Sequence, residues 1–213
     1  MSLTTDLGRR IELVSMDPHF HNISIALYRQ KASQGAVFLV HSYSGKEGTQ
    51  QRIEFVARAM CVLGGMETLP REPQKLRFPC QVEHRLACRR VFLEACKLDP
   101  NAPLEARPLS IPDKKSSRTI SLSYQGEGTY RLTADGEETD KAGRISAVAG
   151  GLMKLGEMQT VDAAGDRVTF SCGQPHHALV GLLLIRALNV RAVLRELEMA
   201  ASRGILSAPS AQK

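Results

Sequence analysis

Apolar and polar residues alternate along short stretches of this chain and are then spaced as on one face of a helix. In the first half, alternation predicts a strand at 23–28, with 36–41 as its hairpin partner, and the apolar residues of 9–15 indicate a further strand. Thr49 is then expected to cap a helix with an apolar face that ends at Gly64-Gly65. A strand ending at Phe78 and a second helix over about 81–98 complete this half.

The second half shows the same patterns in the same order. Strands are predicted at 120–124, 130–133 and 168–170. Asp140 or Thr139 is expected to cap a helix that ends at Gly156, and a long last helix is expected from His176 to about Arg203. The proline-rich segment 99–118 is interpreted as the connector between the halves.

A shift of 92 residues, from Arg52 to Arg144, aligns 52–98 with 144–190 without a gap. Twelve aligned positions are identical, far more than unrelated segments would share, which indicates an internal duplication. The identical pairs are Arg52/Arg144, Ile53/Ile145, Val56/Val148, Ala57/Ala149, Leu63/Leu155, Gly64/Gly156, Met66/Met158, Thr68/Thr160, Phe78/Phe170, Cys80/Cys172, His84/His176 and Ala95/Ala187.

Each repeat therefore follows the order β(β)βαβα. This order predicts an α/β protein of the α+β two-layer sandwich type, with helices packed on a small sheet in each repeat. The expected domains are 1–104 for the first repeat and 105–213 for the second repeat with its tail.

Composition narrows the range of partners. The chain has 213 residues, a formal charge of +6 and a pI near 9.2, which suits anionic ligands. Scattered basic residues and the absence of Trp give no support to nucleic-acid binding. The odd number of cysteines, five, indicates free thiols in a reducing compartment. With no leader-like N-terminus and no apolar run longer than 178–185, we expect no transmembrane segment and a cytoplasmic location.

Several segments resemble the zinc-dependent UDP-(3-O-acyl)-N-acetylglucosamine deacetylase family of lipid A synthesis. Residues 81–87, QVEHRLA, are similar to the family's TVEHLxAAL motif, and 23–38 resembles its opening hairpin. Residues 143–156, GRISAVAGGLMKLG, are similar to its HKxLDxIGDLxLLG helix, and 177–188 resembles its last helix. The resemblance covers about a third of the chain and implies a duplicated ribosomal S5 domain 2-like fold.

The resemblance also implies what chemistry is lost. The family's zinc ligands correspond to His84, Gly143 and Ala147, so two of the three cannot bind metal. Its general base corresponds to Glu83 and its general acid to His177, both present as vestigial candidates. The implied protein is non-catalytic or repurposed, and it binds an anionic or nucleotide-sugar-like molecule between the repeats, without a cofactor.

Two alternatives remain open. In the first, the chain is an active metal-dependent deacetylase or hydrolase with a rebuilt Cys/His site. In the second, it is a structural protein that forms homo-oligomers through the apolar last helix, 178–188.

The repeated Cys-x3-His pairs are the candidate metal ligands for zinc: Cys80 with His84, and Cys172 with His176. An i, i+4 spacing would place each pair on one helix face, and four such ligands suit zinc. The simpler interpretation is a small buried thiol at each strand-to-helix turn, and a reactive thiolate there is a further alternative. His19 is the candidate substrate-binding residue; together with His21 it forms an HxH pattern that is also compatible with a solvated loop.

Overall fold

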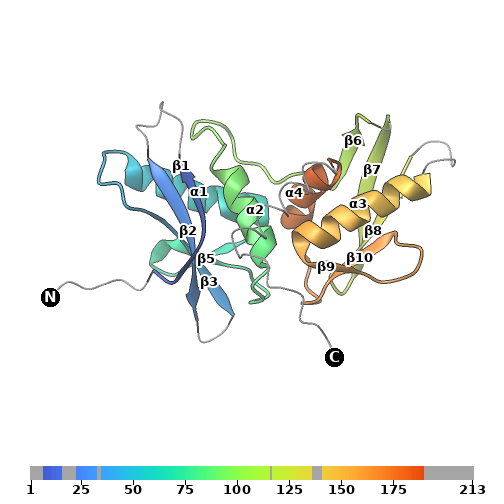
Figure 1. Cartoon of the computed structure of the whole chain (residues 1–213), viewed down its shortest axis with the longest axis horizontal. Helices are drawn as coiled ribbons and strands as arrows, with labels where there is room; N and C mark the ends of the chain where they lie inside the picture. The colour runs from blue at the N-terminus through green and yellow to red at the C-terminus, as the bar shows by residue number, and fades with distance from the viewer. Residues whose placement is uncertain (1–6, 16–22, 33–34, 116, 136–140, 190–213) are drawn as a thin grey trace. The chain divides into compact units, whose positions relative to one another are not determined.

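The computed structural model describes residues 7–15, 23–32, 35–115, 117–135 and 141–189. The chain divides into two compact units, Met1–Arg107 and Pro108–Lys213. Within the described residues, each unit contains one five-stranded antiparallel sheet and two helices (Figure 1). The protein therefore belongs to the α+β class and consists of two similar halves, as the sequence predicts.

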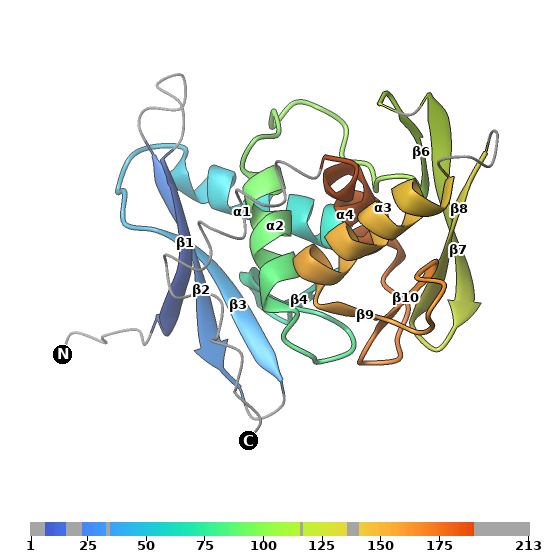
Figure 2. The same cartoon turned by 45° about the vertical axis from the view of Figure 1, so that its right-hand side comes forward.

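In the first unit the sheet has the strand order β1-β2-β3-β5-β4. Figure 2 shows β1, β2 and β3 side by side. Its central strand β3 is buried along most of its length, and α1 contacts β3, β4 and β5 and packs against α2. The bounds are β1 Arg9–Ser15, β2 Ser24–Lys31, β3 Ala36–Ser42, α1 Thr49–Gly64, β4 Glu67–Leu69, β5 Glu72–Arg77 and α2 Arg85–Ala95.

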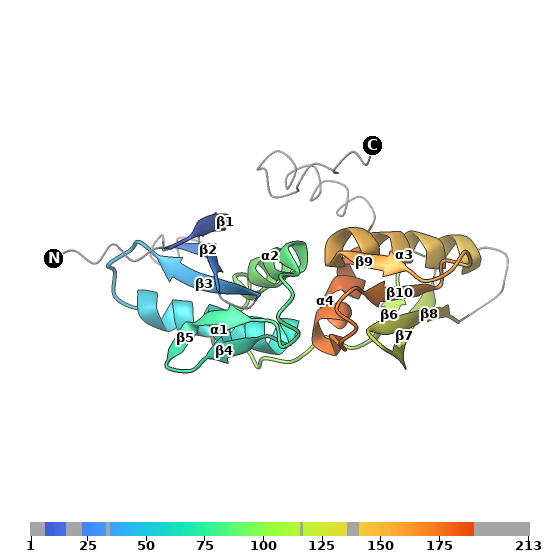
Figure 3. The same cartoon turned by 90° about the horizontal axis from the view of Figure 1, so that it is seen from below.

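The second unit repeats this topology with the order β6-β7-β8-β10-β9. Helix α3 contacts β8, β9 and β10 and packs against α4 (Figure 3). The bounds are β6 Ser110–Asp113, β7 Arg118–Gly126, β8 Thr129–Ala134, α3 Lys141–Gly156, β9 Met158–Thr160, β10 Arg167–Phe170 and α4 His177–Ala187.

The helices of the second unit begin 92 residues after the corresponding helices of the first. Helix α1 begins at Thr49 and α3 at Lys141, and α2 begins at Arg85 and α4 at His177. The identical pair Arg52/Arg144 makes equivalent hydrogen bonds in the two units. Arg52 donates hydrogen bonds to the carbonyls of Cys96 and Leu98, and Arg144 donates one to the carbonyl of Leu188. Carbonyls at a helix C-terminus lack donors within the helix, so each arginine ties one helix of its unit to the end of the other.

The identical glycines Gly64 and Gly156 mark close contacts between the helices. A Cβ atom on Gly64 would lie 3.0 Å from Val91, and one on Gly156 would lie 2.7 Å from Leu183. Val91 and Leu183 are themselves related by the 92-residue shift. The duplication therefore preserves the positions that let the two helices of each unit approach.

Some predicted boundaries are wrong. The second helix begins at Arg85 rather than near 81, because Gln81 and His84 have positive φ angles of 61° and 38°. It ends at Ala95 rather than at 98. The connector 99–118 contains an unpredicted strand, β6, that pairs with β7. Its four residues include a proline at 112, and so short an edge strand lacks a clear alternating pattern.

Other predictions fall on segments outside the described residues. These are His19, His21, the caps Thr139 and Asp140, and the last helix beyond residue 189.

Neighbouring glycines in α3 offer a test of this packing. A Cβ atom on Gly151 would lie 2.9 Å from the Cβ and 3.0 Å from the Cα of Ala187, whereas one on Gly150 would meet nothing within 4 Å. We expect Gly151→Ala to lower the free energy of unfolding by about 1–3 kcal/mol through overpacking. Gly150→Ala should raise it by roughly 0.5–1 kcal/mol because alanine favours a helix. Urea unfolding measures both, and equal effects would contradict the close α3–α4 contact.

Candidate metal centre

In the first unit, a tight turn joins β5 to α2 and brings Cys80 to His84. The backbone N–H of Gln81 donates to the carbonyl of Phe78 at 2.9 Å, and Gln81 has a positive φ. The chain then reaches His84, which precedes α2 with a left-handed conformation. As a result, the Cys80 Sγ lies 3.3 Å from the His84 Nε2.

In the second unit, the segment after β10 begins with the same hydrogen-bonded turn, although His176 has a φ of −132° and is not left-handed like His84. The N–H of Gly173, the residue equivalent to Gln81, donates to the carbonyl of Phe170 at 3.0 Å, and Gly173 also has a positive φ. The Cys172 Sγ lies 3.2 Å from the His176 Nε2. The expectation that each pair shares a helix face is therefore wrong. Both cysteines precede their helices, and the turn brings cysteine and histidine together.

Both histidines are buried against an aromatic ring. His84 is 3% exposed and its ring meets Phe78 edge to face, with centroids 5.3 Å apart. His176 is 5% exposed and meets Phe170 in the same way at 4.8 Å. Burial lowers the pKa of His84 to about 4, because an apolar environment disfavours the imidazolium. His84 is therefore neutral at pH 7 and has a lone pair available for a metal.

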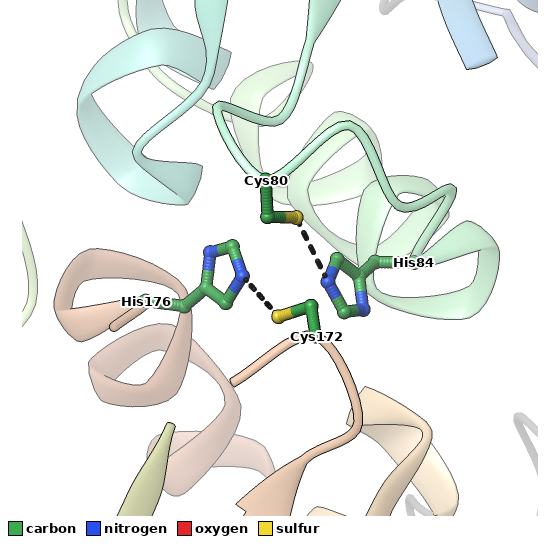
Figure 4. A group of neighbouring side chains, drawn as sticks. All are labelled: Cys80, His84, Cys172 and His176. Atoms are coloured by element: carbon green, nitrogen blue, oxygen red, sulfur yellow. Dashed lines mark hydrogen bonds between the residues drawn. The ribbon is translucent and has the colours of Figure 1, made fainter. Parts of the chain in front are cut away.

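The ligand atoms of Cys80, His84, Cys172 and His176 all lie within 4.8 Å of one another (Figure 4). Tetrahedral zinc with bonds of about 2.3 Å to sulfur and 2.0–2.1 Å to nitrogen would separate its ligand atoms by about 3.3–3.8 Å. The cysteine–histidine distances of 3.3 and 3.2 Å are close to this spacing. The cluster can thus hold a metal ion such as zinc, with two thiols and two imidazoles as donors.

A tyrosine that the sequence analysis did not single out supports the second pair. The fully buried Tyr130 hydroxyl accepts the His176 backbone N–H at 2.8 Å and lies 3.1 Å from the His177 Nδ1. Burial raises the pKa of Tyr130 to about 12, so the hydroxyl keeps its proton and can donate it to His177. The equivalent residue in the first unit is Phe38, which has no hydroxyl. The difference between Phe38 and Tyr130 at equivalent positions is the sequence signal that could have pointed to this hydroxyl.

The residues suggested by the deacetylase resemblance do not join the cluster. Glu83 forms an ion pair with Arg29, with 2.6 Å between Oε1 and Nε. His177 is exposed and contacts Tyr130 and Tyr124. Gly143 and Ala147, which replace two of the family's zinc ligands, lie exposed on α3. His19 lies outside the described residues.

The remaining cysteines are not part of the four-residue cluster. Cys88 and Cys96 are buried, in agreement with a packing role, and burial raises the pKa of Cys96 to about 12. Cys61 is partly buried in α1, and burial raises the pKa of its thiol as well. A protonated thiol is a poor metal ligand, so these positions are suited to packing rather than to chemistry.

Comparison with protein-family models, with curated proteins and with solved structures gives no match. Among the described residues, no helix is both long enough and apolar enough to cross a membrane.

Removing the Tyr130 hydroxyl tests its support of His176. Tyr130→Phe removes the acceptor of the His176 N–H, and we expect the free energy of unfolding to fall by about 1–3 kcal/mol. Tyr124→Phe is the matched control, because Tyr124 is 38% exposed and its hydroxyl can be hydrated. Thermal and urea unfolding of both variants measure the difference. Equal stabilities of Tyr130→Phe and the unaltered protein would show that the hydroxyl does not support the turn.

Proposed function

We propose that this chain is a zinc-binding protein with one Cys2His2 centre, formed by Cys80 and His84 of the first repeat and Cys172 and His176 of the second. The observation that carries the proposal is the convergence of the four ligand atoms within 4.8 Å. Each repeat offers only two ligands, which is too few for a stable zinc site. Zinc binding would therefore require both repeats and would join them.

The donor set favours zinc over other common metals. Two thiolates exclude the hard ions magnesium and calcium, which prefer oxygen ligands. Two imidazoles with two thiolates suit a tetrahedral ion without redox chemistry. The neutral His84 requires no proton to be removed before it binds a metal.

A centre with four protein ligands is structural rather than hydrolytic. A catalytic zinc keeps one position open for water, which the metal activates. Here the fourth position is filled by protein, and the proposed zinc contributes to folding free energy instead. The likeness to the deacetylase family supports a non-catalytic relative with a duplicated S5 domain 2-like fold, in which Glu83 has become an ion-pair partner of Arg29.

Metal analysis of protein purified without added metal or a histidine tag tests this proposal. We expect about one zinc per chain, and Cys80→Ser or His176→Gln should lose most of it. Controls are Cys61→Ser and His177→Gln, which alter the same residue types outside the cluster and should keep the zinc. Chelation should lower the stability of the unaltered protein by several kcal/mol, since zinc binds only the folded chain.

Substitution with cobalt separates the structural from the hydrolytic centre. A closed site should give the visible spectrum of tetrahedral Co(II) with two thiolate charge-transfer bands, unchanged by added anions that compete for an open position. A spectrum that responds to such anions, together with deacetylation of an N-acetyl sugar, would overturn the structural proposal in favour of a hydrolase. A ratio of one zinc to two chains in a dimer would assign the ligands to a homo-oligomer. No zinc after reconstitution would refute the centre itself.

A further inference from the structure

A second candidate site lies wholly within the first unit, where the loop after β3 enters α1. A cavity of about 330 Å³ opens there, and polar residues form much of its lining. The polar lining residues include His41, Ser44, Lys46, Thr49, Gln50 and Gln74.

The N-terminus of α1 gives this cavity a positive electrostatic character. The helix is 16 residues long, and its cap is Gly48, which has a φ of 80° and supplies no side-chain hydrogen bond. Its first turn carries no acidic side chain. The first N–H groups of a helix have no acceptor within it, and the helix dipole favours an anion at this end.

Thr49 supplies an independent indication of a ligand. It lines the cavity, is only 6% exposed, and its Oγ1 has no hydrogen-bond partner among the described residues. A buried hydroxyl without a partner costs free energy, so such groups are uncommon unless a ligand or water satisfies them. An anion bound in the cavity would accept the proton of this hydroxyl.

The charges around the cavity fit a phosphate group. Lys46 lines it, and His41 and Gln74 add further groups that can donate hydrogen bonds. The neighbouring Glu47 is exposed and is not among the residues that line the cavity. The corresponding stretch of the second repeat carries four acidic residues, Asp135, Glu137, Glu138 and Asp140, so the sequence there would repel an anion.

We propose that the cavity at the N-terminus of α1 binds a phosphate group, either as inorganic phosphate or as part of a small phosphorylated metabolite. Thr49 Oγ1 and the first-turn N–H groups of α1 that follow Thr49 would donate hydrogen bonds to the phosphate oxygens, and Lys46 would balance their charge. The Thr49 N–H itself donates to the Lys46 carbonyl at 3.2 Å. The site is independent of the zinc centre, because neither Cys80 nor His84 lines the cavity.

Isothermal titration with inorganic phosphate, ribose 5-phosphate and UDP tests the proposal on the full chain. We expect at least one to bind, with chemical-shift changes at the amides of Gly48, Thr49 and Gln50. Tighter binding of ribose 5-phosphate or UDP than of inorganic phosphate would identify the occupant as an organic phosphate. Tighter binding of inorganic phosphate would identify the free ion.

Thr49→Val and Lys46→Ala should each weaken binding about tenfold, the effect of losing a hydrogen bond or charge on an anion. Thr160→Val and Lys154→Ala, exposed positions of the second unit, are the matched controls and should bind normally. Thr49→Val should retain or increase stability without phosphate, since it removes an unpartnered buried hydroxyl. No binding of any probe, or binding that Thr49→Val and Lys46→Ala leave unchanged, would overturn the proposal. Loss of stability in Thr49→Val without phosphate would assign the hydroxyl a structural role instead.

Discussion

The arrangement of this protein depends on one repeated contact, a buried imidazole packed edge to face on a phenylalanine at the turn from strand to helix. Phe78 and His84 make it in the first unit, and Phe170 and His176 make it in the second. The same phenylalanine carbonyl accepts the hydrogen bond that closes the turn and sets the cysteine beside the histidine. Core packing and the candidate metal ligands therefore depend on the same few residues, and all three residue types occur in both repeats.

Burial at this contact has a chemical consequence. Burial removes water from the imidazole ring and therefore disfavours its charged form. The neutral ring keeps a lone pair, and a metal ion that binds this lone pair can offset part of the free-energy cost of burial. Tyr130 adds a fixed hydrogen bond to the His176 backbone that the first unit, with Phe38, does not have. The two pairs are thus similar in geometry but unequal in support.

Most of the fold could be predicted from the sequence because the duplication checks each assignment twice. The helix from Thr49 to Gly64 follows from its apolar spacing and glycine stop, and the 92-residue shift assigns its counterpart at 141–156. The four candidate metal ligands could be named because both pairs recur at the same position. Their geometry was wrongly predicted, because a spacing of four suggests a helix face and the left-handed conformation of His84 has no side-chain signature. Strand β6 and the role of Tyr130 depend on contacts between distant segments, which local patterns do not contain.

The two repeats keep equivalent helix starts but differ in the sequence that precedes their first helix. Their helix starts and Cys-x3-His turns remain equivalent, as expected if one metal needs ligands from both. The sequences before α1 and α3 differ in charge: 43–48 contains one lysine and one glutamate, whereas 135–140 contains four acidic residues and no basic one. A duplicated protein can keep one copy of a segment for a ligand while the other copy changes, provided that the residues needed in both repeats are retained. The proposed zinc and phosphate sites follow this division, since the first uses residues common to both repeats and the second uses residues of only one.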